Sequence, residues 1–210
     1  MKGILKLLKR KTAPSPNEDF RNSVMFTTAF ADISEEGAVL IPWEARANEI
    51  EAKRLSTSRG LTLMHGIWDS DKYMSRLDSA SVARLGQFFD FATVPADREI
   101  IGQNEHGNFM VVLLSGSIAV DRDQPWGETL RLTEAQAGDI LGEMSLLDSG
   151  QRFSKCTSLN ECQIAVLAAQ ELDQMMATDP LLAANLIALL ARKLASRLRV
   201  VSARLSDVRT

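Results

Sequence analysis

The sequence predicts a mostly β protein, a β-sandwich or jelly roll with flanking helices, that ends in a long helix. The first observation behind this prediction is a series of eight short segments with turn residues between them, spanning positions 91–167. Short strands separated by turn residues at regular spacing are typical of sandwiches and jelly rolls. The second is an apolar repeat, at spacings of four and three, that runs from Ile187 to Val208. This is the a/d pattern of helices that pair along one stripe.

The predicted strands are short and regularly spaced. They are Phe91–Val94, Glu99–Gly102, Phe109–Leu114, Ser117–Asp121, Thr129–Leu132, Ala137–Leu141, Ser154–Ser158 and Gln163–Leu167. Turn residues such as Ser115-Gly116 lie between them. Helical turns are expected ahead of the strands from Tyr73, and again from Glu171 onward with a break at Thr178-Asp179-Pro180.

The chain ahead of the strands is less informative. Residues 1–11 carry five basic side chains and no acidic one. A basic amphipathic helix that touches an anionic membrane surface or a partner is one interpretation. A frayed, solvated terminus is favoured, because 11 residues are marginal for an isolated helix. Val39–Ile41 is a candidate strand, and a helix is expected over Trp43–Leu55, ended by Ser56–Gly60.

These expectations divide the chain into four parts. Residues 1–17 form a basic segment and linker, and residues 18–72 an extension to which the sequence assigns no clear structure. Residues 73–170 form the β-barrel domain, and residues 171–210 form C-terminal helices that provide a dimer interface. A helix with one apolar stripe, like the one predicted here, can also pack back on its own barrel. Self-association is favoured, since the late positions lie beyond the reach of a small barrel.

The net charge of −3 is unevenly distributed. Residues 12–180 hold 13 of the 24 basic and 26 of the 27 acidic side chains, a net charge of −13. An acidic body of this kind repels nucleic acid. A bound anion would therefore have to be held by local groups.

Composition also excludes several classes of protein. No apolar run reaches the roughly 18 residues of a membrane span, and the N-terminus lacks the features of a secretory signal. Two cysteines, Cys156 and Cys162, are too few for a disulfide framework or a four-ligand metal site. They are expected to face each other across a hairpin as buried thiols. A cytoplasmic protein without a metal is the natural interpretation.

Catalytic motifs are missing from the pattern. His65 and His106 are the only histidines, and neither has a partner at metal-ligand spacing. The sequence suggests no Ser/His/Asp or Cys/His arrangement, no phosphate-binding P-loop and no dinucleotide fingerprint. We therefore expect a protein that is not an enzyme.

The stretch from Ala137 to Arg152 has the residues that an anionic sugar phosphate requires. A strand runs into Gly142, Glu143 and a short apolar helix, and Arg152 follows nine residues after the glutamate. Amide groups at a helix start favour an anion. Arg152 can contact two phosphate oxygens, whereas Glu143 can only accept hydrogen bonds and so suits ribose hydroxyls. An ordinary surface ion pair between the two residues is the alternative.

This stretch, together with Pro95–Gly116, resembles the cyclic nucleotide-binding domain family and, within it, the catabolite activator and nitrate-fumarate regulators. The resemblance covers about residues 73–208 and implies a jelly roll whose phosphate-binding cassette is Gly142–Ser154. It implies that Glu143 takes the ribose 2′-hydroxyl and that Arg152 pairs with the cyclic phosphate. It further assigns phosphate contacts near Gly142 to Met144, Ser145 and Phe153, and the base pocket to Val120 and Leu132.

Two departures from the family pattern matter. The family usually has a small residue and then alanine after the arginine, whereas Phe153 and Ser154 follow here. The absence of a hydroxyl at position 153 favours a preference for cAMP over cGMP as the ligand. The regulators also continue into a helix-turn-helix domain, whereas this sequence ends at Thr210, so direct DNA binding is not expected.

The sequence thus predicts a homodimeric sensor for a cyclic nucleotide that signals through an unidentified effector protein. Ligand would draw the C-terminal helix over the base and reset the dimer seam. The alternative is a degenerate domain that binds no nucleotide and serves as a dimerising interaction or localisation module.

Overall fold

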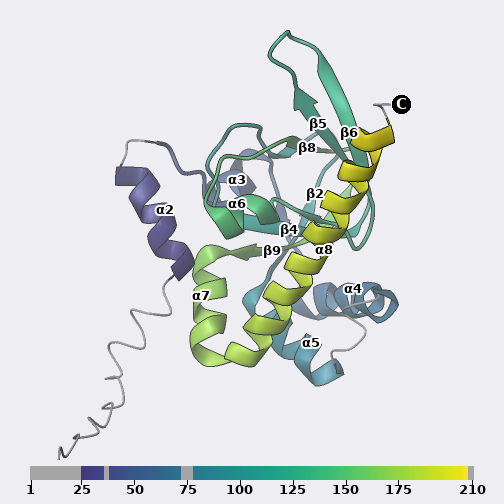
Figure 1. Ribbon diagram of the computed structural model, residues 1–210. Coiled ribbons are helices and arrows are strands. Elements are labelled where there is room, and N and C mark those ends of the chain that lie inside the picture. The colour runs from purple at the N-terminus through teal and green to yellow at the C-terminus, as the bar shows by residue number, and fades with distance from the viewer. Residues whose placement is uncertain (1–24, 36–37, 72–77, 208–210) are drawn as a thin grey trace, which may run out of the picture.

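The computed structural model describes residues 25–35, 38–71 and 78–207, and at its centre lie two antiparallel sheets (Figure 1). The five-stranded sheet has the order β1-β2-β9-β4-β7, and the four-stranded sheet has the order β3-β8-β5-β6. The strands are β1 (Lys53–Arg54), β2 (Asp90–Val94), β3 (Glu99–Ile101), β4 (Phe109–Ser115), β5 (Ile118–Asp123), β6 (Thr129–Ala135), β7 (Ile140–Leu141), β8 (Lys155–Ser158) and β9 (Cys162–Ala168). The predicted jelly roll is confirmed, with all eight predicted strands present at slightly shifted bounds.

The central strands β4 and β9 are buried on both faces, which explains their continuous apolar sequence. In β4, Val111 and Leu113 face the four-stranded sheet, while Met110 and Val112 face the helices. Residues of β9 alternate in the same way between the two cores. The five-stranded sheet is therefore the layer shared by both cores.

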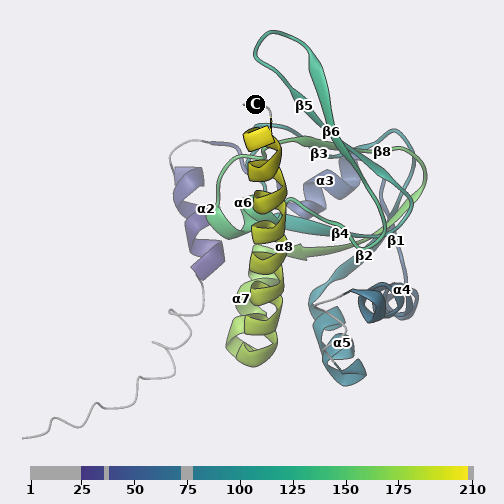
Figure 2. The same ribbon diagram turned by 45° about the vertical axis from the view of Figure 1, so that its right-hand side comes forward.

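Most of the helices cover the outer face of the five-stranded sheet, whereas Trp43 of α3 belongs to the core between the two sheets (Figures 1 and 2). The helices are α2 (Met25–Glu35), α3 (Trp43–Glu49), α4 (Thr57–Ser70), α5 (Ser79–Leu85), the 3-10 turn η2 (Gly86–Phe88), α6 (Glu143–Asp148), α7 (Ala169–Thr178) and α8 (Pro180–Asp207). Gly60 of α4 is needed for close packing, because a Cβ there would lie 2.2 Å from the ring of Phe91. Helix α4 therefore rests directly on β2.

Helix α2 is held by a residue far away in the sequence. The carboxylate of Asp173 on α7 accepts hydrogen bonds from the amides of Phe26 and Thr27 at 3.0 and 2.8 Å and from the Thr27 hydroxyl at 2.6 Å. A carboxylate at the N-terminal end of a helix accepts hydrogen bonds from its unpaired backbone amides and complements the helix dipole. Phe26 and Phe30 then enter the helical core.

The structure corrects the expectation for residues 43–60. The helix from Trp43 ends at Glu49, and the chain then forms β1, where a longer helix to Leu55 was expected. Ser56 does not end a helix but begins α4, because its hydroxyl accepts a hydrogen bond from the amide of Arg59. Serine is favoured at such starts. The candidate strand at Val39–Ile41 is reduced to an isolated bridge between Leu40 and His106.

The predicted hairpin between the two cysteines is also wrong. Cys156 lies in β8 of the four-stranded sheet, whereas Cys162 begins β9 of the five-stranded sheet. The three residues between the end of β8 and the start of β9 carry the chain from one sheet to the other. Both cysteines are free and buried, as expected for structural thiols.

Helix α8 has one buried face and one open face. Its first half packs in the helical core through Leu182, Leu186, Leu189 and Leu190. Of the predicted seam, Ile187 packs against this core, whereas Leu198 is 67% exposed. The helix therefore does pack back on its own domain over its first half, while the later seam positions stay accessible.

Several sequence expectations lie outside the described residues. They concern the basic segment 1–11, the linker 12–17, the side chain of Leu205 and all of Val208. Among the described helices, none is both long and apolar enough to cross a membrane.

The two faces of α8 give a first prediction. Leu190→Ala removes a fully buried side chain and should lower the free energy of unfolding by about 2–5 kcal/mol. Leu181→Ala on the same helix, where the side chain is exposed, should change it by no more than about 0.5 kcal/mol. Chemical denaturation of both variants measures the difference, and equal losses would contradict the packing described for α8.

Candidate functional site

A cavity of about 540 Å³ opens between the four-stranded sheet, α6 and α8. This volume is within the range of about 300–1,000 Å³ that is usual for small-molecule sites. Seven of the eight predicted binding residues line it, namely Gly142, Met144, Ser145, Arg152, Phe153, Val120 and Leu132. The eighth, Glu143, lies behind the wall as a buried carboxylate.

Gly142 joins β7 to α6 at the edge of the cavity. It caps α6 with a φ of +74°, a left-handed conformation that favours glycine. A Cβ at this position would also lie 2.5 Å from Nη1 of Arg152. Two separate constraints, backbone conformation and space for the guanidinium, therefore require glycine here.

Arg152 is 3% exposed yet lines the cavity. Its Nη1 donates to the carbonyl of Gly142 at 2.8 Å, and its Nη2 donates to the carbonyl of Phe109 at 2.6 Å. The guanidinium carbon lies 4.7 Å from the centroid of the Phe109 ring. Burial lowers the pKa of Arg152 to about 10, so the side chain remains protonated at neutral pH.

Glu143 is paired with the C-terminal helix. Its carboxylate accepts a hydrogen bond from Nη1 of Arg197, and Arg197 Nη2 also donates to the carbonyl of Ile140 at 2.8 Å. Burial raises the pKa of Glu143, and the charge of Arg197 opposes that rise. The ion pair therefore offsets part of the cost of burying the carboxylate and fastens α8 to the start of α6.

A second cation fastens the same helix one turn earlier. Lys193 donates to the carbonyl of Gly138 at 3.3 Å and forms an ion pair with Asp71 at 2.8 Å. Beyond these two cations, α8 runs along the cavity, and Val200 and Val201 form part of its wall.

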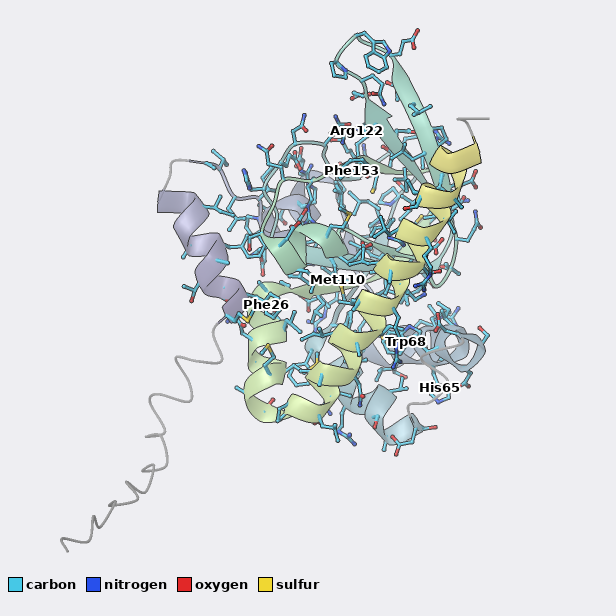
Figure 3. The ribbon with its side chains drawn as sticks, in the orientation of Figure 1. Phe26, His65, Trp68, Met110, Arg122 and Phe153 are labelled. Carbon is cyan, nitrogen blue, oxygen red and sulfur yellow. The ribbon has the colours of Figure 1, made fainter. Side chains whose placement is uncertain are left out.

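Phe153 stands at the mouth of the cavity and is 51% exposed. The guanidinium of Arg122 lies 4.0 Å from the centroid of its ring and also donates to its carbonyl. Figure 3 shows the two labelled side chains together where the β5–β6 hairpin leaves the barrel. The bulky residue after Arg152 is accommodated because it turns outward onto this arginine.

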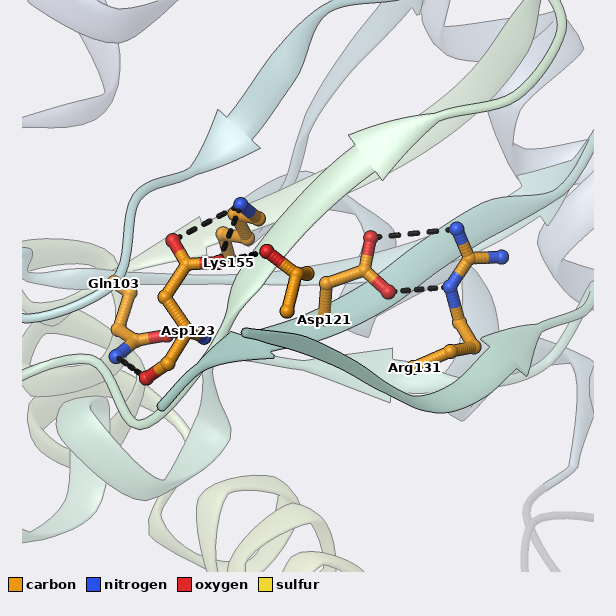
Figure 4. A network of polar contacts seen from close by, with 6 residues as sticks. Gln103, Asp121, Asp123, Arg131 and Lys155 are labelled. Carbon is orange, nitrogen blue, oxygen red and sulfur yellow. Dashed lines mark hydrogen bonds and ion pairs between the residues drawn. The ribbon is translucent and has the colours of Figure 1, made fainter. Parts of the chain in front are cut away.

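A polar cluster holds the base of that hairpin (Figure 4). The carboxylate of Asp123 accepts hydrogen bonds from Lys155 at 2.8 Å and from Thr129 at 2.6 Å. The side chain of Gln103 exchanges two hydrogen bonds with the backbone of Asp123, at 2.7 and 3.0 Å. These contacts tie β5 to the loop after β3 and to β8, beside the cavity.

The far wall of the cavity is apolar. Val120, Leu132, Ile101 and Leu141 line it, together with the buried thiol of Cys156. Burial raises the pKa of Cys156 to about 12, so the thiol stays neutral. Such a surface suits the flat face of an aromatic ring system.

The sequence analysis expected the C-terminal helix to move over the base but named none of its residues as part of the site. Ser196, Arg197, Val200 and Val201 all line the cavity, although the apolar seam alone was assigned to that helix. The available signal was the series of basic residues between the seam positions. A buried carboxylate such as Glu143 needs a cation, and a basic helix is the natural source.

The structure also contains a Ser/His/Asp arrangement, contrary to the sequence-based expectation. His65 of α4 contacts Asp69 through Nδ1 at 2.9 Å and the Ser79 hydroxyl of α5 through Nε2 at 3.1 Å. Asp69 is 66% exposed, so water competes for these contacts and screens their charge. We interpret them as a tie between two helices. Within the described ranges, no group of three or more metal-ligating side chains is close enough to hold an ion.

Comparison with known proteins agrees with this geometry. Residues 91–179 match the model of the cyclic nucleotide-binding domain family. The cyclic AMP receptor protein of Thermus thermophilus is 30% identical over 107 residues, which cover 51% of this chain and 50% of that protein. The catabolite activator protein structure from the same organism is 27% identical, with a TM-score of 0.54 over 63% of each chain. A cyclic nucleotide-binding domain from Methylobacillus flagellatus has a TM-score of 0.65 at 23% identity, covering 70% of this chain and 84% of that one.

The chain therefore contains a domain of the cyclic nucleotide-binding family, related to the Crp-type regulators. It spans about half the length of the curated relatives it matches. Helices α2, α3, α4 and α5 and all of α8 lie outside the matched residues.

The pairing of Glu143 gives a second prediction. Arg197→Gln should raise the pKa of Glu143 further, because burial then acts without the opposing cation. The folded protein would bind a proton more readily, so its stability should increase as the pH falls through that pKa. An NMR titration of the Glu143 side-chain carboxyl carbon measures the shift.

Arg199→Gln is the matched control, since Arg199 lies exposed on the same helix. That variant should leave the titration of Glu143 unchanged. An unchanged pKa in Arg197→Gln would show that the ion pair does not stabilise the charge of Glu143.

Proposed function

We propose that this protein is a sensor that binds a cyclic nucleotide, with cAMP as the preferred ligand. The observation that carries the proposal is the cavity, whose wall holds a buried, protonated arginine beside the start of α6. A buried cation attracts an anion more strongly than an exposed one, because little water screens it. The match of residues 91–179 to the family supports the same ligand class.

Arg152 would bind the cyclic phosphate. A guanidinium has five N–H groups, and the bonds to the carbonyls of Gly142 and Phe109 use two of them. The remaining donors can serve a phosphate without any loss of the existing support. Backbone amides of Met144 and Ser145, at the start of α6, would add further donors.

Glu143 would accept a hydrogen bond from the ribose. Because Glu143 is now paired with Arg197, the ribose hydroxyl and the arginine would share or compete for the carboxylate. The base would lie against Val120, Leu132, Val200 and Val201. Ligand would thus touch α8 at two points, and its occupancy would alter the position of that helix.

Phe153 supports cAMP over cGMP. A hydroxyl at this position would supply a hydrogen bond to a guanine, and a phenyl ring supplies none. The contact of Phe153 with Arg122 leaves the ring at the mouth, where it narrows the entrance.

We further propose a homodimer that forms along α8 and reports to an effector protein. The exposed side chains of Leu198 and Val201 continue the apolar seam beyond the domain core. A change in the position of α8 at the cavity would alter this seam directly. The extension ahead of residue 91 offers the effector protein a surface that the family model does not include.

A second candidate is a dimerising interaction or localisation module that binds no nucleotide. Two observations favour it. The first is that both charged residues of the site already have partners: Arg152 donates to backbone carbonyls, and Glu143 is paired with Arg197. Phe153 also occupies the position where the family usually has a small residue.

Ligand-dependent thermal stability distinguishes the two candidates. At 100 times its dissociation constant, cAMP should stabilise the protein by about 2.7 kcal/mol, which raises the melting temperature by roughly 5–10 °C. Arg152→Ala should abolish the shift, measured against the melting temperature of the free variant, which loss of the bonds to Gly142 and Phe109 should itself lower. Folded protein that shows no shift with millimolar cAMP or cGMP would favour the module without a ligand.

The dimer proposal has its own test. Leu198→Asp places a charge at the exposed seam and should yield a monomer in sedimentation experiments, because a buried unpaired charge disfavours association. Arg199→Gln, at the neighbouring position, should leave the dimer intact. A dimer that persists in Leu198→Asp would show that the seam lies elsewhere.

A further inference from the structure

Helix α3 lies outside the residues that match the family, yet it packs against the surroundings of Arg152. We propose that α3 sets the position of Arg152, with Arg46 and Trp43 as positioning residues for the phosphate of a bound nucleotide. This inference rests on the function proposed above. Three sets of contacts connect the helix to the arginine.

The first step is the backbone of Arg152 itself. Its amide donates to the carbonyl of Glu105 at 2.8 Å, and its carbonyl accepts from the amide of Asn104 at 2.9 Å. The loop between β3 and β4 therefore holds Arg152 on both sides of its peptide. Any movement of this loop moves the arginine.

Arg46 fixes that loop through its side chain. The guanidinium is 3% exposed, and its Nη2 donates to the carboxylate of Glu105. The same carboxylate accepts the amide of Gly102 at 3.1 Å, which closes the loop on itself. Arg46 Nη1 donates to Glu49 at 2.9 Å, so the arginine is anchored in its own helix. Arg46 is thus a buried cation that holds the partly exposed carboxylate of Glu105 in place, and its removal would release that contact.

Trp43 reaches the arginine by a second route. Its ring meets the ring of Phe109 edge-on, with centroids 5.6 Å apart and planes at 60°. Phe109 in turn lies beside the guanidinium of Arg152 and accepts its hydrogen bond. The amide of Ile41 adds a third contact, a hydrogen bond of 2.8 Å to the carbonyl of His106 in the same loop.

The loop and the guanidinium have little room to adjust. A Cβ on Gly107 would lie 2.6 Å from Nη2 of Arg152, so the loop backbone already runs close beside that nitrogen. Binding groups must be held to within about 0.5 Å to act at full strength. The domain core alone supplies Phe109 and the loop, and α3 holds both in place.

Hydrogen exchange in the free protein tests the backbone clamp. In Arg46→Met, the amides of Arg152 and Asn104 should exchange at least about tenfold faster by NMR, since the loop that pairs with them is released. Arg98→Met is the matched control. Arg98 pairs with Glu51, just after α3, and so connects it to the turn before β3 instead of to the loop at Asn104–Glu105. Unchanged exchange in Arg46→Met, or equal acceleration in both variants, would overturn the proposal.

Affinity for cAMP tests the consequence for binding. Titration calorimetry should show about tenfold weaker binding for Arg46→Met and wild-type binding for Arg98→Met. Should Arg46→Met fail to fold, Glu105→Gln keeps the shape of the side chain and should also weaken binding, by about threefold.

Wild-type affinity in a folded Arg46→Met or Glu105→Gln variant would refute a role for α3 in binding. Failure of the wild-type protein to bind cAMP would instead refute the proposed function. The exchange measurement would still decide whether α3 holds Arg152, because it requires no ligand.

Discussion

The structure around the cavity depends on keeping the guanidinium of Arg152 charged while it is buried. Transfer of a cation out of water is costly, and a lowered pKa of about 10 reflects that cost. Carbonyls of Gly142 and Phe109 and the face of an aromatic ring offset part of it. Glycines at 107 and 142 leave the space that the group requires. A phosphate would complete this environment with the one component still missing, a full negative charge.

Much of the barrel could be predicted from the sequence because each strand is short and bounded by turn residues. The cavity residues on one chain segment, from Gly142 to Phe153, were predictable from local chemistry and family resemblance. Residues on α8 were not, since their role depends on how a distant helix crosses the sheet. Ser56 shows a local ambiguity, because serine is common both in loops that end helices and at the start of the next helix. The cysteine hairpin failed because a short connection can also switch sheets.

Helix α8 serves three environments along its length. Leu186 and Leu190 belong to the core, Arg197 and Val200 belong to the cavity wall, and Leu198 faces outward. Residues 197 and 198 are neighbours on the helix, so a rotation that moves one at the cavity also moves the other at the surface. In the proposed dimer, a contact made at the cavity would therefore reach the interface through α8 itself, without intervening residues.

The hydrogen bonds from α2 to Asp173 link this helix to α7, 147 residues further along the chain. An 11-residue helix is marginal on its own, so α2 gains its stability only after α7 is in place. During folding, α2 would therefore be among the last helices to settle. Contacts of such long sequence separation slow folding, because a large loop must close before they form. Formation of α2 therefore requires that α7 has already reached its place in the fold.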